Sequence, residues 1–190
     1  MKKRVAVLIS GRGSNMEALI AACEDTKFPA QIVGVISNKA DAKGLEFAAA
    51  KGIPALAVPH KAYPTREAHD AAMHAALLEL KPDVIACAGY MRIMTPEFVG
   101  KWDGRMINIH PSLLPLFKGT HTHERALAAD VKEHGCSVHY VTAALDDGPV
   151  IAQARIAVLP GDSPETLAAR VLVEEHKLYP VALRLVCESK

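Results

Sequence analysis

Val5-Ala-Val-Leu-Ile9 runs directly into Ser10-Gly-Arg-Gly-Ser-Asn15, and this junction says most about the fold of the 190-residue chain. Five consecutive apolar residues without polar alternation are typical of a parallel strand that is covered on both faces. The glycines that follow predict a tight turn, and the spacing of apolar residues from Met16 onward predicts a helix. The chain therefore opens with a predicted strand–loop–helix unit.

The same alternation of short apolar runs and helix-period segments continues to the end of the chain. Strands are predicted over residues 4–10, 31–38, 55–60, 83–90, 105–110, 136–142 and 149–158. Helices are predicted over residues 16–24, 44–51, 65–80, 96–102 and 122–129, with a last one opening at residues 162–165. This order predicts an α/β fold: one domain over residues 1–190, with a doubly wound, mostly parallel sheet and helices on both faces. Ligands of such sheets bind at the carboxyl ends of the strands.

Helix starts are marked by capping residues. Thr65 and Thr95 stand where N-caps are expected, and Pro96 suits a first helical turn. In the helix after Thr65, the apolar spacing predicts a stripe that faces the core. Its members are Ala68, Ala71, Ala75 and Leu78, and Arg66, Glu67, Asp70 and His74 are expected largely outside it.

Composition and charge exclude several classes of protein. The formal net charge is +1, so no global field attracts nucleic acid or an acidic membrane. The apolar run after Met1–Arg4 has five residues, fewer than the roughly 7–15 of a secretion signal, and no apolar stretch reaches the roughly 18 residues of a membrane span. Cys23, Cys87, Cys136 and Cys187 lack metal or redox spacing and are expected to be buried, reduced thiols. A cytoplasmic location is expected.

The glycine loop at residues 10–15 is a candidate phosphate site. Glycines allow close approach of the backbone to an anion, and the free N–H groups at a helix start favour phosphate. The dinucleotide fingerprint is incomplete, because Met16 replaces its third glycine and the second strand ends at Ser37-Asn38 without an acidic residue. No Walker Gly-Lys-Ser/Thr sequence is present. A tight turn without a ligand remains the alternative.

A second candidate site lies in residues 106–115. Asn108 and His110 are two residues apart on a predicted strand, so their side chains share a face at its carboxyl end. Asp146 or Asp147, in the loop between two late strands, could supply a carboxylate to the histidine, although Asp-Gly-Pro is also common in plain turns. A purely structural histidine remains the alternative. His121 and His123 form a His-x-His pair without a third ligand at convincing spacing, so no metal is expected.

Taken together, these stretches resemble a known family. The sequences Gly-x-Gly-Ser-Asn at 11–15, Gly-Tyr-Met-Arg-Ile at 89–93, Asn-Ile-His-Pro-Ser-Leu-Leu-Pro at 108–115, His-Thr-His at 121–123 and Leu-Asp-x-Gly-Pro-Val at 145–150 occur in order. They are similar to those of the glycinamide ribonucleotide formyltransferases, folate-dependent enzymes of one-carbon metabolism in purine biosynthesis. The resemblance runs from Val5 to Pro180 and implies a Rossmann-like formyltransferase fold.

The resemblance also implies roles for individual residues. Asn108, His110 and Asp146 would form the catalytic set. Gly13, Ser14 and Asn15 would hold the phosphate of glycinamide ribonucleotide, and Glu175 its ribose or amino end. The residues that would line the slot for the co-substrate 10-formyltetrahydrofolate are Arg66, Met91, Arg92, Ile93, Met94, Asn108, Thr142, Ala143, Ala144, Leu145 and Asp146. The partners implied are small molecules, for an enzyme that is a monomer or a homodimer.

Three positions depart from the commonest family pattern. Lys118 stands where proline is expected, Thr120 where leucine is expected, and Asp147 where glycine is frequent. The first two affect the expected shape of the loop after Pro115. Asp147 raises the question of which aspartate faces His110, and alignment on Leu145 favours Asp146.

Formyl transfer passes through a tetrahedral intermediate that carries negative charge on oxygen. Fixed donors aimed at that oxygen are required, and an amide and a protonated imidazole are suitable. A nearby carboxylate orients the imidazole and stabilises its cation. The nucleophile is the amine of the substrate, so the protein needs none of its own.

Other functions remain possible on the sequence alone. Within the formyl-folate enzymes, a hydrolase or a transferase acting on transfer RNA or a sugar nucleotide is an alternative. Relatives of those kinds carry an additional domain that is not expected here, and a net charge near zero disfavours transfer RNA. From other classes, a nucleotide-binding oxidoreductase and a non-catalytic binding protein that uses the same pocket are alternatives.

Overall fold

The computed structural model describes residues 1–189, so Lys190, the last residue of the expected domain, lies outside it. The strands are β1 (Lys3–Ile9), β2 (Ala30–Ser37), β3 (Ala55–Ala57), β4 (Val84–Cys87), β5 (Met106–His110), β6 (Glu133–Tyr140) and β7 (Val150–Ala157). The helices are α1 (Ser14–Glu24), α2 (Lys43–Ala50), α3 (Arg66–Leu80), α4 (Pro96–Lys101), α5 (Thr122–Ala128) and α6 (Pro164–Glu188), with a 3₁₀ turn η1 at His60–Ala62.

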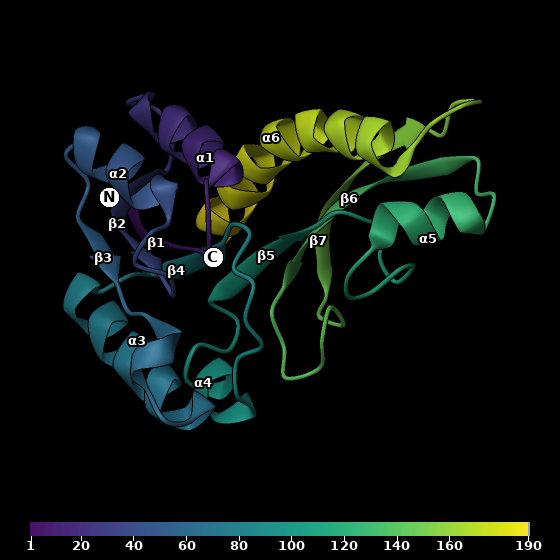
Figure 1. Cartoon of the computed structure of the whole chain (residues 1–190). Helices are drawn as coiled ribbons and strands as arrows, with labels where there is room; N and C mark the ends of the chain where they lie inside the picture. Colours follow the sequence, from purple (N-terminus) through teal and green to yellow (C-terminus); the bar gives the residue numbers. More distant parts are fainter. Residues whose placement is uncertain (190) are drawn as a thin grey trace.

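The strands form one sheet in the order β3-β2-β1-β4-β5-β6-β7 (Figure 1). Strands β1 to β5 are parallel to one another, whereas β6 is antiparallel to both β5 and β7. The mostly parallel, doubly wound α/β sheet is therefore confirmed, and the β6–β7 hairpin at one edge was not predicted. The chain moves outward from β1 to β3 and then returns to β4, so the loops after β1 and β4 diverge at the switch point where such sheets bind ligands.

Helices cover both faces of the sheet, as the continuous apolar runs predict. All five residues of Val5–Ile9 have no exposed surface. Val5, Val7 and Ile9 share one core with side chains of α1, α2 and α6, while Ala6 and Leu8 belong to a second core with α3 and α4. Figure 1 shows α1 and α6 on one side of the sheet and α3 and α4 on the other. Both faces of β1 are therefore buried.

The expected helix caps are present. Thr65 Oγ1 accepts the Ala68 N–H at 3.1 Å, and Thr95 Oγ1 accepts the Phe98 N–H at 3.2 Å. Helix α6 begins with a capping box between Ser163 and Thr166. These side chains satisfy backbone donors that have no partner within the helix, and so they fix where each helix begins.

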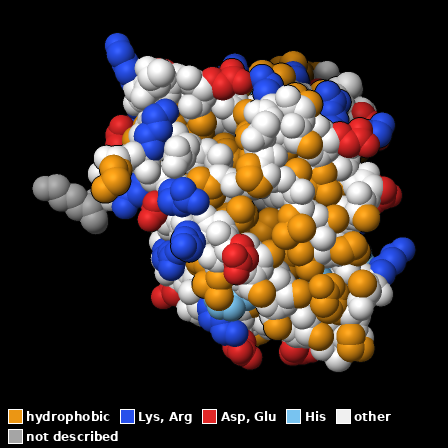
Figure 2. Space-filling model, turned by 90° about the vertical axis from the view of Figure 1, so that its left-hand side faces the viewer, with side chains coloured by type: hydrophobic (Ala, Val, Ile, Leu, Met, Phe, Trp, Pro, Cys, Tyr) orange, Lys and Arg blue, Asp and Glu red, His pale blue; other side chains and the backbone are white. Residues whose placement is uncertain are grey.

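The predicted inward stripe of α3 is wrong. The buried residues of this helix are His69, Asp70, Met73 and Leu77, whereas Leu78 is 53% exposed. The polar pair is buried because each side chain has a backbone partner: His69 Nε2 lies 3.0 Å from the Val58 carbonyl, and Asp70 Oδ2 accepts the Thr95 N–H at 2.7 Å. Ala71 and Ala75 of the predicted stripe are exposed, and Ala68 is half-buried. Figure 2 shows hydrophobic side chains gathered on the side of the molecule where α2, β3 and α3 lie.

The four cysteines are free thiols, as expected. Cys87, Cys136 and Cys187 are buried and Cys23 is partly buried. Burial raises the pKa of the Cys87 thiol to about 12 and that of Cys136 to about 12, so both stay protonated at neutral pH. None of the described helices is both long enough and apolar enough to cross a bilayer.

Candidate active site

A cavity of about 590 Å³ opens at the carboxyl ends of β4 and β5. Four segments line it, together with several single residues. The segments are residues 89–94, 108–111, 119–123 and 141–146, and the single residues are Asn15 of α1, Cys87 of β4, Val99 of α4, His139 of β6 and Glu175 of α6. Segments that are distant in the sequence therefore meet where a doubly wound sheet is expected to bind its ligand.

His110 and Asp146 face each other in this cavity. His110 Nδ1 lies 3.4 Å from Asp146 Oδ2, and the two side chains are only 7% and 8% exposed. The same carboxylate oxygen accepts the Gly119 N–H at 2.9 Å. On its other side, His110 Nε2 lies 2.9 Å from the Phe117 carbonyl. The ring is thus held between a carboxylate and a backbone acceptor.

Asn108 reaches this pair through His139, a residue that the sequence did not single out. Asn108 and His139 are cross-strand partners of β5 and β6, and Asn108 Nδ2 lies 3.2 Å from His139 Nε2. His139 Nε2 is also 3.7 Å from Asp146 Oδ1. Its Nδ1 lies 2.9 Å from the Tyr140 carbonyl, so Nδ1 carries the proton and Nε2 accepts from the Asn108 amide. Burial lowers the pKa of His139 and favours this neutral form.

The neighbouring aspartate is not part of this cluster. Asp147 is 55% exposed and pairs with Lys118, which lies in the loop after Pro115. The hydrogen bond from Lys118 lowers the pKa of Asp147. Two of the three positions that depart from the family pattern therefore contact each other, and they join the two loops that flank the cavity. Asp146 is the carboxylate that faces His110.

The glycine loop lines a second, smaller cavity of about 230 Å³ beside the first. Gly13 has a left-handed backbone, with φ of 77°, and precedes the first residue of α1 without a side-chain cap. The first N–H groups of the helix are therefore free to bind a ligand. Arg12 and Lys39 are the cationic residues among those that line this cavity. The loop has the charge and the backbone donors that a phosphate group requires.

Asn15 and Glu175 connect the two cavities. Asn15 lines both, and its Nδ2 donates to Glu175 Oε2 at 2.7 Å. Glu175 is 8% exposed, and burial raises its pKa. The structure therefore brings the residues of the expected ribonucleotide set together: Gly13, Ser14 and Asn15 at the loop, with Glu175 on the adjoining helix α6.

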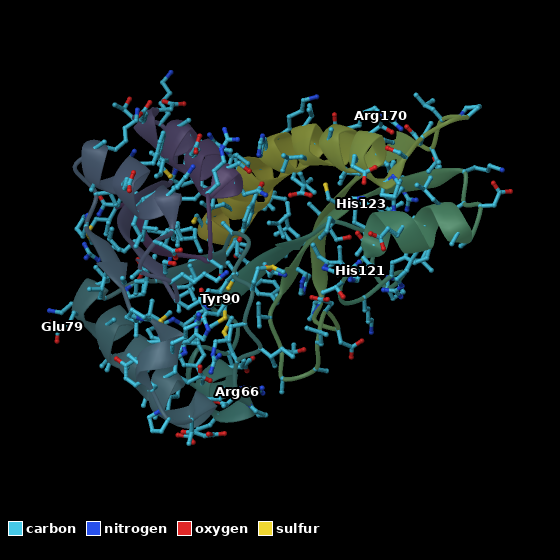
Figure 3. The ribbon with its side chains drawn as sticks, viewed as in Figure 1. Arg66, Glu79, Tyr90, His121, His123 and Arg170 are labelled. Carbon is cyan, nitrogen blue, oxygen red and sulfur yellow. The ribbon has the colours of Figure 1, made fainter. Side chains whose placement is uncertain are left out.

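Most of the expected folate residues line the main cavity. Met91, Arg92, Ile93 and Met94 do so from the loop after β4, and residues 142–146 from the loop between β6 and β7. The Met91 N–H donates to Ser10 Oγ at 2.7 Å, which ties the loop after β4 to the glycine loop. Arg66 is the exception. It is exposed at the start of α3, outside the lining of the cavity, and Figure 3 shows it near α4, away from His123.

Across residues 1–189, no group of three or more His, Cys, Asp and Glu side chains is arranged to hold a metal ion. The cluster of Asn108, His110, His139 and Asp146 instead offers hydrogen-bond donors and a proton-accepting carboxylate in a partly closed space. That set is suited to stabilising an oxyanion and moving a proton.

Residues 3–183 match the model of the formyl transferase family. The chain belongs to the formyl transferase family. The match includes every residue that lines the two cavities.

Individual relatives agree with this assignment. The phosphoribosylglycinamide formyltransferase of Escherichia coli K12 is 48% identical over 186 residues, which are 98% of this chain and 88% of that protein. The structure of phosphoribosylglycinamide formyltransferase from Brucella melitensis matches with a TM-score of 0.95 and 53% identity, covering 100% of this chain and 98% of that one. The human trifunctional purine biosynthetic protein adenosine-3 is 49% identical over 188 residues, but the chain spans only 19% of that protein's length.

Proposed function

We propose that this chain is a phosphoribosylglycinamide formyltransferase, which transfers the formyl group of 10-formyltetrahydrofolate to the amine of glycinamide ribonucleotide. The observation that carries the proposal is the contact between His110 and Asp146 in a cavity that adjoins a phosphate-type glycine loop. The near-full-length similarity to bacterial proteins of that name supports the choice of substrate.

The two cavities suit the two substrates. The glycine loop, with Gly13, Ser14 and Asn15, binds the phosphate of the ribonucleotide, and Glu175 binds its ribose or amino end. The main cavity, with its apolar lining from Met91 to Met94 and from Thr142 to Leu145, takes the formyl-folate. Asn15 lies where the cavities join, so the amine and the formyl carbon meet close to Asn108 and His110.

The reaction is a transfer between two nitrogens. The amine nitrogen attacks the formyl carbon, the carbonyl oxygen becomes an oxyanion, and the bond to the folate N10 then breaks. Asn108 Nδ2 carries two hydrogens, of which one is donated to His139 and the other is free to stabilise the oxyanion. Asp146 orients His110 and accepts the proton that leaves the amine, directly or through water, for delivery to N10.

His110 Nε2 must give up a hydrogen bond within the protein before it can donate one to the oxyanion. His110 Nε2 contacts the Phe117 carbonyl at 2.9 Å. Phe117 has a left-handed backbone, with φ of 52°, in the loop that ends at Gly119. We therefore propose that substrate binding displaces this carbonyl, so that Nε2 turns from a loop contact to a reacting oxygen. Active-site hydrogen bonds often rearrange in this way on forming the reactive complex.

The decisive experiment is an assay of the purified chain with glycinamide ribonucleotide and 10-formyltetrahydrofolate, in which the folate product is followed by absorbance. Formation of folate product that depends on the ribonucleotide supports the proposal. Folate product formed at the same rate without the ribonucleotide would instead support a formyl-folate hydrolase. Product formed with methionyl transfer RNA or a sugar-nucleotide amine, but not with the ribonucleotide, would reassign the acceptor. A titration with NAD(P)H tests the oxidoreductase alternative.

We further propose that residues 1–190 work as one formyltransferase domain in the cytoplasm, as a monomer or a homodimer. The four free cysteines suit a reducing compartment. Sedimentation at working concentrations distinguishes the two states of association.

A further inference from the structure

The three residues of His121-Thr122-His123 have three different environments. His121 is exposed, and its Nδ1 lies 3.0 Å from Glu124 Oε2. Thr122 is buried and donates its hydroxyl to the Pro111 carbonyl at 2.7 Å, which fixes the start of α5 against the residue that follows His110. His123 is half-buried and lines the main cavity, close to the start of α5 and facing α6 (Figure 3). His121 also lines the cavity but is exposed, so the second histidine is the more enclosed of the two.

His123 is paired with another histidine, His134 of β6. His123 Nδ1 lies 3.1 Å from His134 Nε2, and the two rings meet at 89° with centroids 5.2 Å apart. His134 is 1% exposed, and the edge of the Phe117 ring covers it from another side. A hydrogen bond between two neutral imidazoles has one donor and one acceptor, so each ring is restricted to a single tautomer.

The burial of His134 decides which ring donates. His134 Nδ1 is buried and has no hydrogen-bond partner. A buried N–H without a partner is rarer and costlier than a buried bare nitrogen. His134 therefore carries its proton on Nε2 and donates it to His123 Nδ1, and His123 carries its own proton on Nε2. Burial, and to a smaller degree the nearby rings of His123 and His110, lowers the pKa of His134 to about 4, so the ring is neutral.

His123 lines the same cavity as Asn15 and Glu175, the residues at its ribonucleotide end. His134 and Cys136 are two residues apart on β6 and so share a face of the strand. Cys136 packs against Leu167 and Val171 of α6, and it is near enough to Glu175 for that carboxylate to raise the pKa of its thiol. Glu175 in turn holds Asn15 of the glycine-loop helix. Within the described chain, His123 Nε2 is not among the buried polar atoms that lack a partner, so it is open to the cavity.

We propose that His134 holds His123 in the Nε2-protonated tautomer, so that His123 donates a hydrogen bond to an acceptor oxygen of the bound ribonucleotide. His123 is then a substrate-binding residue and His134 a positioning residue that acts through it. The inference rests on the proposed function for the identity of the ligand, but the tautomer is a property of the protein alone.

The tautomer is tested first, on the wild-type protein without substrate. Long-range ¹H–¹⁵N correlation spectra of ¹⁵N-histidine-labelled protein at pH 7.5 distinguish a bare nitrogen from a protonated one. The result expected for both rings is a bare Nδ1 and a protonated Nε2. Finding the proton of His123 on Nδ1, or either ring as a cation, overturns the inference whatever the enzyme acts on.

Kinetics test the role of the donor. Glutamine places an amide N–H near the position of histidine Nε2, whereas leucine has no donor. His123→Gln is expected to keep the KM for glycinamide ribonucleotide within about twofold, and His123→Leu to raise it about three- to tenfold, the effect of one lost hydrogen bond. His134→Leu is expected to raise the same KM by a similar factor, with the KM for 10-formyltetrahydrofolate within twofold.

A matched control replaces a half-buried histidine outside the cavity. His74 of α3 packs its ring against Trp102, and His74→Leu is expected to leave both KM values unchanged. If His123→Leu and His123→Gln behave alike, or if only the folate KM responds, the donor role is wrong. If no ribonucleotide-dependent turnover exists in the wild type, the proposed function has failed, while the tautomer measurement still stands or falls by itself.

Discussion

Asp146 has a backbone conformation that few residues other than glycine, asparagine and aspartate adopt, with φ of 49°. Its carboxylate lies against His110, His139 and the Gly119 N–H, whereas the carboxylate of the next residue pairs with Lys118 in solvent. Two adjacent aspartates therefore have opposite environments, with side chains 8% and 55% exposed. The left-handed backbone at Asp146 thus turns its carboxylate toward the buried histidines, while the carboxylate of the next residue, Asp147, stays at the surface.

This contrast supplies a matched pair of variants. Asp146→Asn removes the charge that, in the proposed mechanism, orients His110 and receives the proton, and it is expected to lower kcat about 10²- to 10⁴-fold while the protein stays folded. Asp147→Asn makes the same chemical change one residue later and is expected to keep kcat within about threefold. Steady-state kinetics and circular dichroism measure both. Similar losses in the two variants would show that the assignment of Asp146 is wrong.

Ser10 joins the two cavities through one hydroxyl. Its Oγ accepts the Met91 N–H at 2.7 Å and donates to Asn38 Oδ1 at 2.6 Å, and both Ser10 and Asn38 are buried. Ser10→Ala leaves the part-buried Met91 N–H and the buried Asn38 Oδ1 without this partner, so the free energy of unfolding is expected to fall by about 1–3 kcal/mol. The KM for 10-formyltetrahydrofolate is expected to rise more than that for the ribonucleotide, because Met91 lines the main cavity, which is the proposed folate site. Urea titration and kinetics check the two effects, with exposed Ser189→Ala as the control.

At the scale of elements, the β6–β7 hairpin carries Asp146 and depends on a glycine. A Cβ added at Gly148 would lie 1.8 Å from the Tyr140 carbonyl oxygen, which is part of the backbone and cannot move aside. The Tyr140 N–H also donates to the Pro149 carbonyl at 2.9 Å, so the base of the loop is fixed on both sides. The geometry of the Asp146 carboxylate therefore depends on the absence of a side chain two residues away, at Gly148.

Gly148→Ala is expected to lower both the melting temperature and kcat, since the alanine pushes the strands apart directly below Asp146. Gly100→Ala is the control, because a Cβ at that position meets nothing within 4 Å in helix α4. Alanine is preferred to glycine in a helix by about 0.5–1 kcal/mol, so the control is expected to be neutral or more stable. Calorimetry and kinetics on both variants are the measurement, and a Gly148→Ala protein with parental kcat would contradict this account.

The sequence predicted where the helices and strands lie better than it predicted which of their faces are buried. Buried strands such as β1 are marked by unbroken apolar runs, and threonine caps mark where α3 and α4 begin. The predicted strand at 83–90 ends earlier, at Cys87, because Gly89 has a positive φ that departs from the strand. The face of α3 was mistaken because His69 and Asp70 are buried by partners on Val58 and Thr95, which are distant in the sequence. Periodicity within one helix cannot reveal such partners.

The residues of the candidate site also differ in how far the sequence alone could predict them. Asn108 and His110 could be paired from the sequence because their spacing alone places them on one face of β5. His139 could not, because its role requires that β6 run antiparallel to β5 and pair in the register that sets it opposite Asn108. A short loop before β7 was the available signal for a hairpin, and antiparallel pairing would then have suggested the cross-strand neighbour.

At the scale of the whole molecule, buried histidines make the free energy of unfolding depend on pH. Burial lowers the pKa of His69, His123, His134, His139 and His176. A histidine whose pKa is lower in the folded chain binds protons more tightly when unfolded. Its contribution to stability is therefore complete above the unfolded pKa of about 6.5 and is lost as the pH falls from there toward the folded value.

The free energy of unfolding is accordingly expected to decrease between pH 6.5 and pH 4, by up to about 1.4 kcal/mol per pH unit for each such histidine. His134, with its pKa lowered to about 4, contributes across the whole of that range. His134→Gln removes one titrating group and should give a shallower dependence than the parent. Urea titrations at several pH values check this, and equal slopes in the two proteins would exclude His134 as a source of the acid sensitivity.

The tip of the β6–β7 hairpin has an implication for protein engineering. Ala143, Ala144 and Leu145 line the larger cavity yet belong to no strand, and Leu145 is 58% exposed. Replacing them changes the wall of the cavity without interrupting a sheet hydrogen bond. A combinatorial library confined to these three codons could therefore select variants that accept altered pterin analogues, while the neighbouring carboxylate keeps its chemistry.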